Sequence, residues 1–130
     1  SDHQMVELAP LLVRRILHRD FHLFSLQERR EMLETLRKLS LEHAEKSAIE
    51  LLHGDASRAS QENASTQHVA LELLAKYGEG PASLEALKLA SQPHPERHRD
   101  VQQAAHRALE QFMARRHAAG SGAALRREDR

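Results

Sequence analysis

The chain has 130 residues, of which 40% are hydrophobic, 29% charged and 3% aromatic, and its 19 basic and 19 acidic side chains give a formal net charge of zero. A chain of this length buries roughly two-thirds of its unfolded surface, enough for one compact domain, while the balanced charge excludes an overall positive field that would attract nucleic acid or an anionic membrane. The lack of cysteine excludes disulfides and thiolate metal sites and, with a mean hydropathy of -0.63, favours a soluble cytoplasmic protein.

The first predicted helix lies in the apolar stretch 5–17, where Pro10 either kinks the helix or stands near its start. We interpret this helix as a half-unit that covers the beginning of a helical array. A short connector that contains Phe21 and Phe24 follows it. No apolar run in the chain approaches the roughly 20 residues that a membrane-spanning helix needs, so no membrane span is predicted.

A capping box predicts the start of the second helix. Ser25 and Glu28 have the Ser-x-x-Glu spacing in which each side chain accepts a hydrogen bond from the other residue's backbone amide. Apolar residues then recur every three or four positions to about Leu39, which predicts an amphipathic helix. Ser40 can cap a third helix, which we expect to end at Gly54.

The stretch 55–63 is polar and lacks periodicity, so it is predicted to be a surface loop. A fourth helix should begin near Ser65 or Thr66 and end at Tyr77. The glycines of 78–80 then break the helix, as a turn between antiparallel helices requires.

Pro81 stands at the predicted first position of a fifth helix, where its missing amide has no cost. That helix should stop at Gln92, before two prolines. The last strong apolar pattern covers 101–113 and predicts a helix that reaches His117. Because 118–130 is rich in glycine, alanine and charge, we expect a frayed or partner-docked tail there.

A repeat organises these helices. Leu33, Leu71 and Leu109 begin similar segments that are 38 residues apart, a period typical of stacked helical arrays. When the first unit is aligned with the second at this spacing, Ala44 also matches Ala82. Each unit of such an array buries its apolar face only against its neighbours, which leaves the outer surface free for a partner.

The segment 100–109 resembles the first helix of a bacterial HEAT-type repeat. The residues that agree with the family are Asp100, Val101, Ala104, Ala105, Ala108 and Leu109. Gln102 stands where the family commonly has Arg, and Ser40 replaces the turn glycine that the second unit has at Gly78. The resemblance covers about 24–116, and armadillo and other helix-pair repeats remain related alternatives.

The resemblance implies an all-α fold, a short α-solenoid of about six helices in antiparallel pairs, with the repeat domain at 1–117 and a tail at 118–130. It also implies a non-enzymatic scaffold that holds another protein or a neighbouring domain, without cofactor or metal. In this family the second helix of each pair commonly lines the concave side. The protein-binding ridge implied here consists of Glu45, Lys46, Glu50, Ser83, Glu85 and Lys88. The alternative is that these six side chains are simply the solvated face of amphipathic helices.

Other functions have weaker support in the sequence. The pairs His18/His22 and His94/His98 have the four-residue spacing that can present two imidazoles to a metal on one helical turn. However, prolines beside His94 and the end of the first helix at His18 interrupt that geometry, and no third ligand is evident. Basic dyads are interleaved with acids, so backbone binding of nucleic acid is not favoured.

Two expectations concern assembly. Because repeat arrays need polar terminal helices, the apolar first helix and the alanine-rich last helix could accept a second copy, which makes self-association the second hypothesis. The chain begins with Ser1 rather than Met, which favours an excised domain or a residue left by an affinity tag. With the HEAT-type resemblance, the first alternative implies a part of a larger bacterial protein.

Overall fold

The computed structural model describes the backbone of residues 2–53, 61–95 and 97–128, and the side chains of 8–53, 64–95 and 97–119. All regular elements in these segments are helices. They are α1 (Asp2–Ile16), the 3-10 helix η1 (Arg19–Leu23), α2 (Leu26–Leu39), α3 (Leu41–Leu52), α4 (Gln61–Tyr77), α5 (Pro81–Ser91) and α6 (Arg99–Glu128). The prediction of an all-α fold with about six helices is confirmed.

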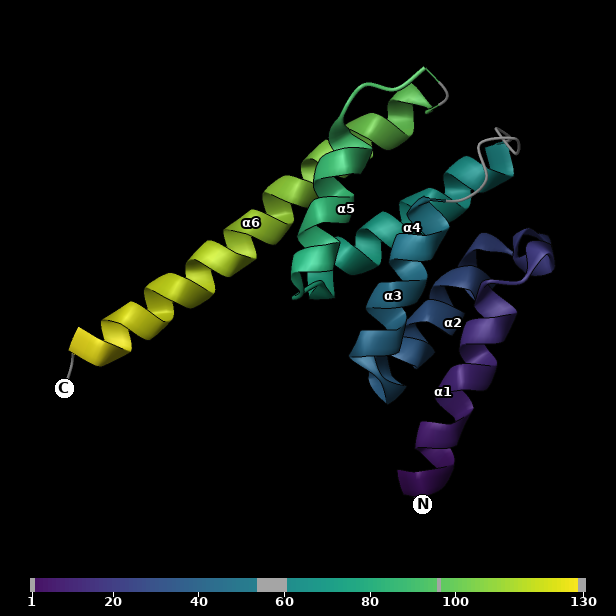
Figure 1. The fold of residues 1–130 in the computed structure, drawn as a ribbon, viewed down its shortest axis with the longest axis horizontal. Coiled ribbons are helices and arrows are strands. Elements are labelled where there is room, and N and C mark those ends of the chain that lie inside the picture. Colours follow the sequence, from purple (N-terminus) through teal and green to yellow (C-terminus); the bar gives the residue numbers. More distant parts are fainter. Residues whose placement is uncertain (1, 54–60, 96, 129–130) are drawn as a thin grey trace.

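The helices form two layers (Figure 1). In the view shown, α2, α4 and α6 run in one common direction, and α1, α3 and α5 run across them. Each helix packs against the next helix in the chain and also against the next but one. This pattern is what a short α-solenoid produces, because successive helices alternate between two stacked layers. No helix within the described segments is both long and apolar enough to cross a membrane.

Side chains at the predicted caps define the first helix pair. Ser25 Oγ accepts a hydrogen bond from the Glu28 amide at 3.1 Å, and Glu28 Oε1 accepts one from the Ser25 amide at 3.2 Å, so the capping box is present. Ser40 ends α2 and begins α3: its amide donates to the Leu36 carbonyl at 2.7 Å, and its Oγ accepts from the His43 amide at 3.3 Å. One residue therefore makes the turn between the two helices.

Two predicted boundaries are wrong. The helix α4 begins at Gln61, so residues 61–63 are helical and not part of a loop, while 55–60 lie outside the described residues. Ala64 and Thr66 are buried in the first turns of α4, which explains why the helix starts earlier than its polar sequence indicates. At the other end, α6 continues to Glu128 where we expected a tail after His117, because alanines favour continued helix.

Other boundaries are close to those predicted. The first helix passes through Pro10, which lies inside α1 and is exposed. The third helix ends at Leu52, and the predicted stop at Gly54 lies outside the described residues. Pro81 is the first residue of α5, as expected for a proline at a helix start.

The 38-residue spacing describes the α2, α4 and α6 layer well. Leu36, Leu74 and Phe112 are 38 residues apart and are 0%, 0% and 2% exposed, so equivalent positions enter the core of each unit. Leu33 and Leu71 are also buried, while Leu109 is half-buried at the end of the array. The repeat inferred from the sequence therefore corresponds to a repeated core position in this layer.

The same spacing holds only in part for the second helices, where Ala48 and its equivalent Ala86 are both buried. Ala44 is buried, but its predicted equivalent Ala82 is exposed. The burial of α3 and α5 instead matches at a spacing of 39, which pairs Ala44 with Ser83 and Ala48 with Leu87. The cause is the longer turn of residues 78–80, which changes the rotation at which α5 meets the core.

Candidate functional site

Four of the six predicted ridge residues face solvent, as expected. Lys46, Glu50, Glu85 and Lys88 are exposed on α3 and α5. The Lys46 ammonium lies 3.3 Å from Glu42 on the same helix, and both side chains are 75% exposed. An ion pair this exposed contributes little to stability, so these groups are available for contact.

The other two ridge residues serve the fold, and the expectation that Ser83 faces solvent is wrong. Ser83 is 1% exposed, and its hydroxyl donates a hydrogen bond to Glu45 Oε1 at 2.9 Å. The same oxygen accepts hydrogen bonds from the amides of Glu79 at 2.5 Å and Gly80 at 3.2 Å. Glu45 therefore caps the start of α5, where Gly80 has no side chain to do so and where a helix favours negative charge.

A groove that sequence reasoning missed lies between α2 and α4 of the other layer. It is open to solvent and has a volume of about 240 Å³. The lining residues are Gln27, Arg30, Glu31, Leu33 and Glu34 of α2 and Val69, Glu72, Leu73, Lys76 and Tyr77 of α4. Its floor is apolar and its rim is charged. The sequence shows each helix to be amphipathic, but no pattern within it indicates which charged side chains meet across the two helices.

One ion pair crosses this groove. Arg30 Nε lies 3.0 Å from Glu72 Oε2, and Arg30 Nη2 lies 3.0 Å from Glu72 Oε1. This two-point contact raises the pKa of Arg30, mainly through the hydrogen bonds from its guanidinium to Glu72. The side chains are 42% and 45% exposed, so the pair orients the rim more than it stabilises the fold.

A second arginine, Arg37, contacts the lining residue Tyr77 but is not itself one of the residues that line the groove. The Arg37 guanidinium carbon is 4.0 Å from the centre of the Tyr77 ring, within the range of a cation–π contact. Arg37 Nε also donates to Glu34 Oε1 at 3.1 Å. Hydrogen bonding from Arg37 is the main cause that lowers the pKa of Glu34, and the charges of Arg37, Lys38 and Lys76 lower it further.

Two charged side chains on the rim form no ion pair among the described residues and can therefore bind a charged group of a ligand. Glu31 accepts a hydrogen bond from the side-chain Nε2 of Gln27 at 3.1 Å. It forms no ion pair with any of the described side chains. Lys76 is exposed and likewise forms no ion pair with any described carboxylate. The groove therefore offers one acidic and one basic group beside two arginines that are already paired.

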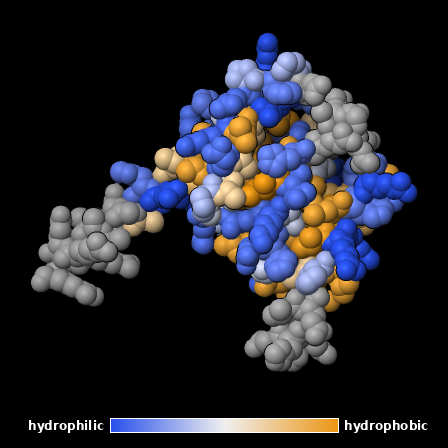
Figure 2. All heavy atoms as spheres, viewed as in Figure 1, coloured by the Kyte–Doolittle hydropathy of each residue, from blue (hydrophilic) through white to orange (hydrophobic). Residues whose placement is uncertain are grey.

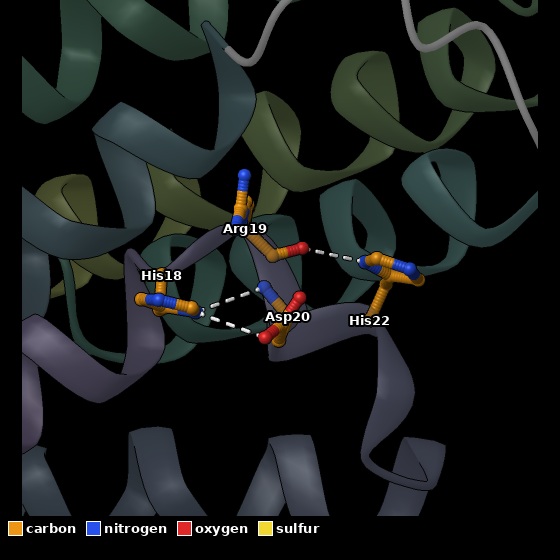
Figure 3. A network of polar contacts seen from close by, with 4 residues as sticks. All are labelled: His18, Arg19, Asp20 and His22. Carbon is orange, nitrogen blue, oxygen red and sulfur yellow. Dashed lines mark hydrogen bonds and ion pairs between the residues drawn. The ribbon is translucent and has the colours of Figure 1, made fainter.

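The histidine pairs do not form the metal geometry considered above. Figure 3 shows His18 and His22 on either side of the Arg19–Asp20 segment: His18 Nδ1 accepts from the Asp20 amide at 3.1 Å, and His22 Nδ1 lies 2.7 Å from the Arg19 carbonyl. His94 and His98 lie in the connection between α5 and α6. The described residues contain no group of three or more His, Cys, Asp or Glu that could hold a metal.

Two arginines that belong to pairs of neighbouring basic residues, Arg29 and Arg115, form hydrogen bonds within the fold. Arg29 is 6% exposed and donates from Nη1 to Thr66 Oγ1 at 2.6 Å. Arg115 donates to carbonyl oxygens at the end of α4: Nε to Ala75 at 2.7 Å, and Nη2 to Gly78 at 2.9 Å and Leu74 at 3.3 Å. The dyads are therefore not continuous basic surfaces.

Comparison of the chain with protein-family models, with curated proteins and with solved structures gave no match.

Proposed function

We propose that this chain is a non-enzymatic protein-binding domain, built as a HEAT-like array, that holds another protein or a neighbouring domain in the groove between α2 and α4. The observation that supports it most is the combination of an apolar floor with a charged rim on two neighbouring helices of one layer. Binding sites are typically concave and largely apolar, with a few polar groups that set orientation. A role within a larger bacterial protein of the cytoplasm is part of the same proposal.

Side-chain contacts position two arginines at and beside the rim. Arg30 is held by Glu72, and Arg37 is held by Glu34 and the Tyr77 ring. A partner that binds a preorganised surface loses less side-chain entropy on association than one that must order the same side chains. Such a surface needs no nucleophile or general acid to act as a binding site.

The test compares two charge-neutral variants of the chain as baits in a lysate of its native source. One bait carries Glu31→Lys with Lys76→Glu in the groove, and the matched bait carries Glu50→Lys with Lys88→Glu on the predicted ridge. We expect a protein captured by the wild-type chain to be retained by the ridge variant and lost by the groove variant, with helical circular dichroism unchanged in both. If the captured protein is lost from the ridge variant alone, the binding surface lies on α3 and α5. If no folded bait captures any protein specifically, the protein-binding role is contradicted.

Self-association is the second candidate, and a specific feature favours it. Five large apolar side chains near the α1 end are at least a third exposed: Leu8, Leu11, Leu17, Leu23 and Leu26. Figure 2 shows apolar side chains reaching the surface among hydrophilic ones at that end of the visible face. Exposed apolar patches commonly mark protein contacts.

Solution mass measured across dilution tests this candidate. Self-association predicts a mass that rises with concentration and returns to that of the monomer with Leu11→Glu and Leu23→Glu, which change the two most exposed leucines at 59% and 74%. A monomer at all concentrations would exclude it.

A further inference from the structure

The size of the groove between α2 and α4 limits what can enter it. Its volume of about 240 Å³ exceeds that of a roughly 150 Å³ apolar cavity that accepts benzene. Leu33, Val69 and Leu73 are 1%, 3% and 6% exposed, so the floor is part of the packed core. One aromatic or large aliphatic side chain fits this space, while the rest of a partner must lie outside it.

The two arginines limit the length of the opening. Arg30 crosses from α2 to Glu72, which lies between the lining residues Val69 and Leu73 of α4, and Arg37 lies over Tyr77, the last lining residue of α4. The two arginines are seven positions apart on α2, which is roughly 10 Å along a helix at about 1.5 Å per residue. A long helix laid along the groove would have to displace both contacts, whereas a short segment with a single anchor side chain covers less of the groove and displaces fewer of them.

Charge determines what flanks the anchor. Glu31 on α2 and Lys76 on α4 are the rim groups without an ion pair among the described residues, and they lie on opposite sides of the opening. A basic group on the partner complements Glu31, and an acidic group complements Lys76. A phosphate backbone is disfavoured, because it would meet three carboxylates beside Arg30 and Lys76.

We infer that the groove binds a peptide segment that presents one aromatic or large aliphatic residue between a basic and an acidic residue, the basic residue beside Glu31 and the acidic residue beside Lys76. This inference rests on the proposed protein-binding function and specifies its partner. Because the two flanking charges differ in sign, they also set the direction in which the segment binds.

The test uses random heptapeptides displayed on phage and selected on four immobilised forms of the full chain: wild type, Lys76→Glu, Glu31→Lys and Glu50→Lys. We expect the wild type to select peptides with a large apolar residue between a basic and an acidic residue. The Lys76→Glu form should select a basic residue in place of the acidic one, and Glu31→Lys an acidic residue in place of the basic one. The Glu50→Lys form changes an exposed residue of α3 and should select the same peptides as the wild type.

Affinities of the synthetic peptides, measured by fluorescence anisotropy, complete the test. We expect each groove variant to bind the peptide selected on the wild type with about tenfold lower affinity, equal to ~1.4 kcal/mol. A peptide in which the matching charge is reversed should bind that variant with the original affinity. Selected peptides that do not change between the four baits would overturn the inference and leave the protein-binding function standing. No enrichment on any bait with intact helical circular dichroism would also overturn the inference, and the lysate capture described above then decides the protein-binding function separately.

Discussion

At the scale of single residues, Gly78 is required by close packing rather than by its backbone angle. None of the described glycines has a positive φ, but a Cβ at Gly78 would lie 2.6 Å from the Leu74 carbonyl oxygen and 3.2 Å from the Phe112 ring. We expect Gly78→Ala to lower the free energy of unfolding by about 1–3 kcal/mol, as overpacking of a core does, measured by urea denaturation. Gly80→Ala is the control, because a Cβ there has no neighbour within 4 Å, and an equal loss in both variants would contradict the steric explanation.

Glu45 shows a second residue-scale effect. Replacement by alanine removes the acceptor of three hydrogen bonds and leaves the buried Ser83 hydroxyl without its Glu45 partner. We expect Glu45→Ala to lower the free energy of unfolding by about 1–3 kcal/mol, the usual cost of an unsatisfied buried polar group. The exposed Glu50→Ala should change it by less than about 0.5 kcal/mol, so similar losses in thermal denaturation of the two variants would mean that Glu45 does not cap α5.

Glu34 makes stability depend on pH. Hydrogen bonding from Arg37 lowers the pKa of Glu34 below its ordinary value of 4.5. Its contribution to stability is therefore present above that value and is lost as the pH falls through the lowered pKa. Glu34→Gln should have a lower Tm than the wild type at neutral pH, and the difference should disappear in acid. Glu31→Gln on the same helix is the control, and a Tm difference for Glu34→Gln that persists unchanged in acid would refute the assignment.

At the scale of elements, Arg115 joins α6 to the end of α4. Its guanidinium donates to three carbonyl oxygens from two nitrogens, a planar arrangement that an ammonium cannot reproduce. We expect Arg115→Lys to lower the free energy of unfolding by about 1–3 kcal/mol, measured by guanidinium denaturation. Arg116→Lys changes an exposed neighbour of the same charge and should have little effect. Equal stabilities for the two variants would contradict this role.

The sequence predicted the elements best where the signal is local. The caps at Ser25 and Ser40 and the proline at the start of α5 depend on residues within one helical turn, and the structure confirms them. The register of α5 was wrong because the effect of a longer turn on helix rotation depends on packing. The groove was missed for a related reason: Arg30 and Glu72 are 42 positions apart, and nothing local connects them.

At the scale of the whole molecule, α4 occupies the centre of the array. It packs against α2, α3, α5 and α6, whereas α6 extends beyond its neighbours toward the C-terminus (Figure 1). We expect native-state hydrogen exchange to be slowest for the amides of α4 and fastest, among helical amides, for residues 118–128, because this end of α6 extends beyond the neighbouring helices and local opening is easiest where no other element packs. Exchange of 118–128 that is as slow as that of α4 would contradict this expectation.

The one-residue difference in spacing between the two layers has a consequence for building longer versions of the protein. An engineer who duplicates a unit by copying 38 residues keeps the α2 and α4 positions aligned. A second helix exchanged between the units at this spacing, however, would be turned by about 100° at 3.6 residues per turn, because Ala44 would take the exposed place of Ala82 instead of the buried place of Ser83. A chimera in which α3 replaces α5 must therefore shift by one residue, or carry its own short turn at Ser40 with it.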